Sequence, residues 1–136
     1  MLNKKKGILF WVTGLSGSGK TSIAKLLQKE IGSHYGSTIV VSGDDIRNSF
    51  GLNGYSKISR EKIGLMYTNF FKIILDQKIN IIFAGIVLID SVRLYNRKII
   101  SNYFEIYLKS NINQLRKRKK TYKLKKNVVG VDIIPE

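Results

Sequence analysis

Residues 14–21 read Gly-Leu-Ser-Gly-Ser-Gly-Lys-Thr, which matches the pattern G-x-x-x-x-G-K-[ST] in full. The apolar run at residues 8–12 before this stretch is typical of a buried strand, and residues 22–27 after it have helical spacing. The pattern therefore stands in the order strand, loop, helix that a phosphate-binding loop requires. A glycine-rich turn that matches by chance is the alternative, and the flanking strand and helix argue against it.

The residue types of this loop suit a nucleoside triphosphate. Glycines let the backbone wrap closely around an anion, beside the positive end of the following helix. Lys20 supplies a cation for the β- and γ-phosphates, and the hydroxyl of Thr21 is expected to ligate Mg²⁺. The expected ATP-binding residues of the loop are Gly14, Leu15, Ser16, Gly17, Ser18, Gly19, Lys20 and Thr21.

The composition favours one compact domain over residues 1–136. Of these residues 43% are hydrophobic, one is proline and none is cysteine, so disulfides, thiolate catalysis and cysteine-ligated metals are excluded. No apolar run approaches the length of a membrane-spanning helix, and the charged start at residues 1–6 leads directly into the first expected strand. We expect no membrane association, no signal peptide and a cytoplasmic location.

The whole chain has a formal net charge of +15, and a basic run lies in its last third. No acidic residue interrupts it, and its members are Lys109, Arg116, Lys117, Arg118, Lys119, Lys120, Lys123, Lys125 and Lys126. A solvated helix face and a nucleic-acid-binding arm are two interpretations. We favour a third, a basic lid at about residues 116–126 that covers the bound triphosphate. The nucleic-acid interpretation rests on net charge alone and ranks last.

Apolar runs and helical patterns alternate along the chain. Strands are predicted at residues 8–13, 38–41, 80–86 and 104–108, and helices at residues 21–31, 60–76, 91–100 and 112–118. Such alternation predicts an α/β protein in which helices cover both faces of a parallel sheet in three layers, α/β/α. Together with the phosphate loop, it indicates the P-loop NTPase fold. Ligands then bind at the carboxyl ends of the strands.

Charged residues follow the second expected strand at that end. Asp44 is placed to orient Mg²⁺ or to accept a hydroxyl proton in phosphoryl transfer, and Arg47 to hold a phosphate or sulfate. The alternative is that Asp44 or Asp45 caps a helix and Arg47 is exposed. Tyr55, in a glycine-flanked loop, could stack on a base, although a packed surface tyrosine is the simpler interpretation.

These motifs together resemble the adenylylsulfate kinase family. The likeness begins with Phe-Trp-Val-Thr at residues 10–13 and the loop itself, and continues through residues 43–47, 54–60, 95–97 and 102–107 to residues 127–132. It covers almost the whole chain in the family's order. Family members usually continue with another strand and a closing helix, so the last strand and helix of the fold are expected to be missing here.

The resemblance implies an enzyme that uses MgATP to phosphorylate the 3′-hydroxyl of adenosine 5′-phosphosulfate, giving 3′-phosphoadenylyl sulfate for sulfate assimilation. It implies that Lys20 and Asp44 are catalytic and that Arg118 belongs to the lid over ATP. The implied acceptor-binding residues are Asp44, Arg47, Tyr55, Arg60 and Val128. Because the family is commonly dimeric, a homodimer is also an expectation.

Four departures from the family pattern concern the acceptor, the metal and the lid. Ser42 replaces an aspartate, Val87 a serine, and Val128 an aromatic that forms half of a base sandwich. The lid pattern Arg-Asp-Pro-Lys-Gly-Leu-Tyr is shortened to residues 118–122 and lacks its aspartate. Two alternatives follow: a 3′-kinase of another nucleotide, such as cytidine diphosphoramidate in capsule synthesis, and a non-catalytic ATP-binding relative.

Overall fold

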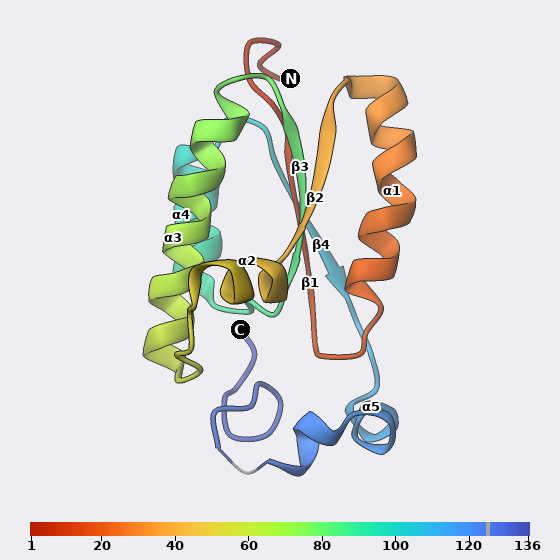
Figure 1. The fold of residues 1–136 in the computed structure, drawn as a ribbon, viewed down its shortest axis with the longest axis vertical. Helices are drawn as coiled ribbons and strands as arrows, with labels where there is room; N and C mark the ends of the chain where they lie inside the picture. Colours follow the sequence, from red (N-terminus) through yellow and green to blue (C-terminus); the bar gives the residue numbers. More distant parts are fainter. Residues whose placement is uncertain (125) are drawn as a thin grey trace.

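The computed structural model describes residues 1–124 and 126–136 and has a parallel sheet at its centre (Figure 1). Lys125, which belongs to the predicted lid, lies outside the described residues. The sheet has four strands in the order β2-β3-β1-β4. They are β1 (Leu9–Gly14), β2 (Thr38–Ser42), β3 (Asn80–Gly85) and β4 (Tyr103–Leu108).

The register places the phosphate loop at a point where the strand order reverses. β1 pairs with β3 through Thr13 and Gly85 on one side, and with β4 through Gly14 and Leu108 on the other. The connection that leaves β1 leads to β2 at one edge of the sheet, whereas the connection that leaves β3 leads to β4 at the opposite edge. Ligands of open parallel sheets bind in the crevice that such a reversal creates at the carboxyl ends.

Helices cover both faces of the sheet, as Figure 1 shows. On one face, α1 (Lys20–Tyr35) packs over a buried group that includes Val12 and Ala84. On the other, α3 (Lys57–Leu75) and α4 (Asp90–Ile99) pack over Trp11 and Phe83, and α3 contributes Phe71 to this core. Neighbouring residues of β1 thus face opposite layers, because side chains alternate along a strand. The predicted three-layer α/β/α fold is confirmed.

Two short helices stand at the carboxyl ends of the strands and were not predicted. They are α2 (Gly43–Phe50) and the 3₁₀ helix η1 (Lys120–Lys123). α3 also begins three residues before the predicted start, because the side chain of Ser56 accepts a hydrogen bond from the N–H of Ser59 and caps the helix. Within the described part of the chain, every helix is too short or too polar to cross a membrane.

The C-terminal segment packs beneath the carboxyl ends of the strands (Figure 1). It starts with α5 (Ile112–Arg118), at its predicted bounds, and continues through η1 to residue 136. Its buried side chains form a cluster with Leu15 of the phosphate loop and Leu88. The members contributed by the segment are Leu115, Tyr122, Val128, Val129 and Ile133. The segment is therefore anchored directly on the loop.

Candidate active site

The phosphate loop joins β1 to α1 and turns through two left-handed glycines. Gly17 and Gly19 have φ angles of 84° and 90°, which residues with a Cβ atom rarely adopt. Gly19 is the N-cap of the 16-residue helix α1, whose first N–H groups have no partner within the helix. The loop thus presents a helix N-terminus, which attracts anions, next to Lys20 and Thr21.

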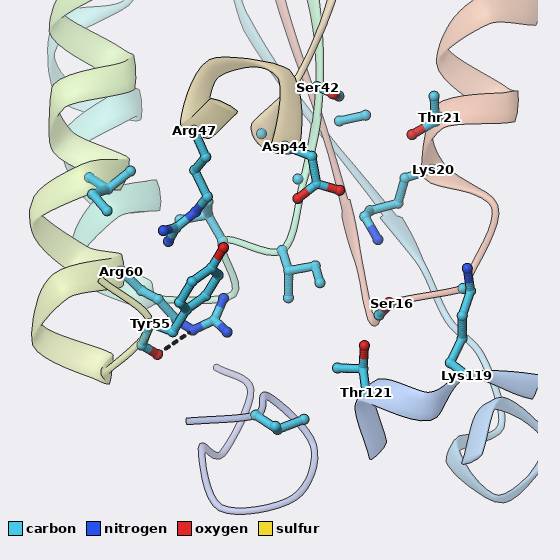
Figure 2. A pocket seen from close by; sticks show the side chains of 18 of the residues that line it. Ser16, Lys20, Thr21, Ser42, Asp44, Arg47, Tyr55, Arg60, Lys119 and Thr121 are labelled. Atoms are coloured by element: carbon cyan, nitrogen blue, oxygen red, sulfur yellow. Dashed lines mark hydrogen bonds between the residues drawn. The ribbon is translucent and has the colours of Figure 1, made fainter. Parts of the chain in front are cut away.

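A cavity of about 810 Å³ lies between the phosphate loop, α2, α3 and the C-terminal segment (Figure 2). Among the described residues, those that line it and carry charge are Lys20, Asp44, Arg47, Arg60, Lys119 and Lys126. Five of the six are cations. A wall of this kind concentrates a polyanionic ligand and suits a nucleotide that carries several phosphates.

Lys20 carries a half-buried ammonium group at one end of this cavity. Its Nζ donates a hydrogen bond to the carbonyl of Leu15 over 2.9 Å. Burial lowers the pKa of Lys20 to about 8; the Asp44 carboxylate opposes this shift, and the Lys119 ammonium adds to it. A phosphate next to Lys20 would favour its charged form, so the free side chain is electrostatically suited to an anion.

Ser42, rather than an aspartate, caps α2. Its Oγ accepts a hydrogen bond from the N–H of Asp45 over 3.1 Å. The alternative in which Asp44 or Asp45 is the cap is therefore wrong, since both lie in the first turn of the helix. The carboxylate of Asp44 reaches into the cavity between Lys20 and Arg47, as Figure 2 shows.

Tyr55 lies between two arginines at the other end of the cavity. The guanidinium carbon of Arg47 is 4.4 Å from the centre of its ring, and that of Arg60 is 5.5 Å away. Arg60 Nε donates to the carbonyl of Tyr55 over 2.8 Å (Figure 2), and Arg47 donates to the carbonyl of Gly54 over 2.7 Å. Burial first, and then the neighbouring Arg47, lower the pKa of Arg60. Both arginines therefore hold the loop that carries Tyr55.

The C-terminal segment closes the cavity below this cluster. Val128 lines the cavity, and the carbonyl of the preceding Asn127 accepts a hydrogen bond from Arg60 over 3.0 Å. Val87, which follows β3, lines the cavity as well. The predicted acceptor residues Asp44, Arg47, Tyr55, Arg60 and Val128 are thus brought to one cavity.

Not every residue of the predicted ATP-binding set reaches the cavity. Ser16, Gly17, Gly19, Lys20 and Thr21 line it. Gly14, Leu15 and Ser18 belong to the loop but do not line the cavity. Leu15 packs into the C-terminal cluster, and the buried Oγ of Ser18 has no hydrogen-bond partner in the described chain. Arg118 is not brought to the cavity.

The structure brings the next residue, Lys119, to the cavity wall. The predicted lid at about residues 116–126 includes Lys119, but sequence reasoning singled out Arg118 instead, because within an uninterrupted basic run no signal separates neighbouring side chains. Only the point where α5 ends decides which of them turns inward, and Lys119 has extended backbone angles of φ −119° and ψ 121° directly after that helix.

The cavity also contains oxygen groups suited to Mg²⁺. The described residues include no cluster of three or more histidine, cysteine, aspartate or glutamate side chains that could hold a metal. A magnesium ion that arrives with a nucleotide takes most of its ligands from phosphates and water, and only one or two from the protein. The hydroxyl of Thr21 and the carboxylate of Asp44, which both line the cavity, fit that requirement.

Residues 6–132 match the model of a protein family described as adenylylsulphate kinase. The chain is 35% identical to a cytidine diphosphoramidate kinase of Campylobacter jejuni over 137 residues, covering 96% of the chain and 81% of that relative. It is 33% identical to an adenylyl-sulfate kinase of Bacillus velezensis over 132 residues, with coverage of 92% and 66%. For an adenylyl-sulfate kinase of Bacteroides fragilis the identity is 30%, but the chain spans only 59% of that relative.

Solved structures agree with this match. A mutant APS kinase of Mycobacterium tuberculosis superposes with a TM-score of 0.65 at 25% identity, over 76% of each chain. An APS kinase of the same bacterium, in complex with AMPPNP and APS, gives a TM-score of 0.73 over 85% of this chain and 69% of that one; at 23% identity this likeness shows the fold. Since the family match covers the phosphate loop, the acceptor-side motifs and most of the C-terminal segment, the chain belongs to the adenylylsulphate kinase family, whose members are phosphotransferases.

Proposed function

We propose that this chain transfers the γ-phosphoryl group of ATP to the ribose 3′-hydroxyl of a nucleotide whose 5′ end carries an anionic group. One observation carries the proposal: the phosphate loop, the Asp44 carboxylate and the cluster of Arg47, Tyr55 and Arg60 share one cavity. The cavity thus joins a triphosphate-binding end to a second end that has cations and an aromatic ring. Phosphoryl transfer needs this juxtaposition of donor and acceptor.

At the first end, the loop binds the triphosphate. Backbone N–H groups beside Gly17 and Gly19 hold phosphate oxygens, and Lys20 neutralises charge on the β- and γ-phosphates. Thr21 and Asp44 would hold Mg²⁺, which would withdraw charge from the phosphates. These groups are set before the reaction begins, so they stabilise the developing charge with little reorganisation.

Between the two ends, Asp44 acts on the acceptor hydroxyl. The hydroxyl oxygen forms a bond to the γ-phosphorus, the bond from this phosphorus to the β–γ bridging oxygen breaks, and ADP leaves. Asp44 accepts the hydroxyl proton, directly or through water. Because phosphoryl transfer has a loose transition state, positioning and charge neutralisation provide most of the catalysis.

At the second end, Tyr55 offers a ring for the acceptor base, and the arginines favour its anionic group. Arg47 and Arg60 already donate to backbone carbonyls, but each guanidinium has five N–H donors, and both side chains line the cavity. Their remaining donors are available to a phosphate or sulfate.

Two acceptors are supported by different observations. The motifs of Asp44, Arg47, Tyr55 and Arg60 support adenosine 5′-phosphosulfate, as do the family match and the adenylyl-sulfate kinases among the relatives. Val128 in the cavity wall and the Campylobacter jejuni relative support cytidine diphosphoramidate. Without an aromatic at residue 128, a purine loses more stacking area than a pyrimidine. We therefore expect the cytidine compound to be the better acceptor and adenosine 5′-phosphosulfate the second candidate.

An ADP-release assay with each acceptor, followed by mass spectrometry of the product, tests the proposal. Phosphorylation of the cytidine compound in preference to the sulfate would support the expected order, and the reverse preference would favour sulfate activation. ATP binding without phosphorylation of either acceptor would contradict the proposed activity and would favour the non-catalytic alternative.

We infer the location, domain organisation and oligomeric state that the sequence predicts. The enzyme is cytoplasmic, has one domain over residues 1–136 and associates into a homodimer. The need for ATP as a substrate supports the cytoplasmic location, and the resemblance to a commonly dimeric family supports the homodimer. Light scattering at several protein concentrations tests the dimer, and a constant monomer mass would contradict it.

A further inference from the structure

The side chain of Lys119 extends along the phosphate loop. A Cβ atom placed on Gly17 would lie 3.0 Å from Cγ and 3.2 Å from Cε of Lys119, so the lysine stem is packed against the loop backbone. Figure 2 shows its side chain rising beside the loop, with the ammonium group at the loop and on the same side of the cavity as Lys20, and Lys119 is among the residues that line the cavity. Its side chain therefore reaches the place where the loop would hold a phosphate.

Buried neighbours on both sides fix the backbone of Lys119. Its N–H donates to the carbonyl of Leu115, which is fully buried, over 3.0 Å. Three residues later, Tyr122 is 7% exposed, and its hydroxyl donates to the carbonyl of Ser16 over 2.7 Å. These hydrogen bonds therefore attach the turn that carries Lys119 to the phosphate loop. A lysine that only faced solvent would not need a turn fixed in this way.

The charges around Lys119 also point to an anion. Lys119 is close enough to Lys20 to contribute to the lowered pKa of that ammonium group. It forms no ion pair within the described chain, and Asp44 is the one carboxylate among the described residues that line the cavity. Two cations held near each other at a helix N-terminus repel, and an anion between them removes that repulsion.

We propose that Lys119 binds the triphosphate of ATP together with Lys20, in place of the lid arginine that the resemblance assigns to Arg118. This inference rests on the proposed binding of ATP to the loop. The family's lid pattern has aspartate directly after the arginine, and aspartate at residue 119 would repel phosphate. Ser42 also replaces an aspartate, so both departures make the cavity more positive. Lys119 thus takes part of the charge neutralisation.

Calorimetric titration with ATP, and separately with inorganic tripolyphosphate, tests this role without any acceptor. Lys119→Met keeps the stem over Gly17 and removes the charge. We expect it to weaken the binding of both ligands by roughly 10- to 100-fold, as for a lost charge-assisted hydrogen bond. Lys119→Arg restores a cation and should recover most of the affinity. Arg118→Gln and Lys117→Gln each remove one charge from α5 and should change affinity by about twofold or less, because exposed charges are screened.

Circular dichroism and thermal melting first establish that each variant is folded. Parent-like affinity in folded Lys119→Met would overturn the inference, and so would equal losses in Lys119→Met and Lys117→Gln, which would indicate a general effect of net charge. A loss in Arg118→Gln alone would assign the role to Arg118. If the parent binds ATP but phosphorylates neither acceptor, the proposed function fails, whereas these titrations still decide the role of Lys119.

Discussion

The side chain of Lys20 illustrates how a ligand site differs from a structural core. Its ammonium is half-buried beside Lys119, and its pKa falls to about 8 from the ordinary 10.5. A buried cation without a strong partner destabilises the fold. The carbonyl of Leu15 and the more distant Asp44 compensate only in part. Such a group is explained by the anion that it binds rather than by the stability that it adds.

We therefore expect Lys20→Met to abolish phosphoryl transfer and to leave the fold intact. Loss of a cation that acts on the transferred group should lower kcat by at least about 10²- to 10³-fold. ADP release by the variant and its circular dichroism spectrum are the two measurements. A parent-like rate in a folded variant would show that the loop has another role.

The same substitution should change how stability depends on pH. The folded-state pKa of Lys20, about 8, lies below the unfolded value of 10.5, so the unfolded chain binds more protons between these values. The free energy of unfolding of the parent should then rise with pH through this window, by at most roughly 3 kcal/mol. Lys20→Met should lack this contribution and should be more stable than the parent at pH 7.

Urea unfolding of both proteins at pH 7, 8, 9 and 10, without nucleotide, measures this effect. The difference between them isolates Lys20, because the other titrating groups are shared. A difference that stays constant over the range would mean that the pKa of Lys20 is not lowered.

Among the helices and strands, those with an apolar pattern of their own could be predicted, even the seven-residue α5, whereas α2 and η1 could not. Each predicted strand starts and ends within one residue of the observed β1 to β4, because each strand coincides with a largely apolar run of the sequence. α2 has only eight residues, and the sequence suggests no more there than a functional carboxylate at Asp44, or a helix cap at Asp44 or Asp45. It forms because Ser42 caps it and Ile46 is buried against the main core, and such tertiary support leaves little periodicity in a short segment.

The two ends of the candidate site also differ in how far the sequence predicts them. The phosphate loop is local, so its residues and its neighbouring strand and helix could be predicted from one stretch of sequence. The acceptor end combines α2, α3 and residues 127–128, and its contacts, such as that between Arg60 and the carbonyl of Asn127, join segments far apart in the chain. Family resemblance predicted which residues meet there, but not that both arginines would hold the backbone.

The cap of α2 allows a matched test of a helix that positions Asp44. Ser42→Ala removes the acceptor for the N–H of Asp45 and should lower the free energy of unfolding by about 1 kcal/mol. Ser42→Asp should keep the parent stability, because aspartate caps equally well, and should strengthen Mg²⁺-dependent ATP binding by adding a carboxylate. Urea unfolding and calorimetry check both. Equal destabilisation by the two substitutions would contradict a capping role.

Across the chain, one C-terminal segment serves both ends of the cavity. Near the ATP end, Tyr122 donates to the carbonyl of Ser16, and near the acceptor end, Asn127 accepts a hydrogen bond from Arg60. Asn127 has a left-handed φ of 61°, which is uncommon for a residue with a side chain. Its conformation is held by Asp132, whose two carboxylate oxygens accept the N–H groups of Asn127 and Val128, each over 2.7 Å.

The carboxylate of Asp132 should therefore position the acceptor without touching ATP. The hydrogen bond from the Val128 N–H, followed by that from Asn127, holds the pKa of Asp132 below its ordinary value, which shows that the charged form is the one that binds the loop. Asp132→Asn leaves one oxygen for two N–H groups. We expect the KM for the acceptor to rise about tenfold, as for a lost hydrogen bond to a charged group, with little change in the Kd for ATP.

Asp76→Asn provides the matched control, because Asp76 is an exposed carboxylate that pairs with Lys6 and Lys72 away from the cavity. Steady-state kinetics with whichever acceptor is phosphorylated, together with ATP titration, separate the two ends. A selective rise in the KM for the acceptor would show that the loop at residues 127–132 acts on the acceptor half alone. Equal weakening of ATP and acceptor binding would instead mean that the C-terminal segment moves as one unit, because its anchors on Ser16 and Arg60 would then be energetically coupled.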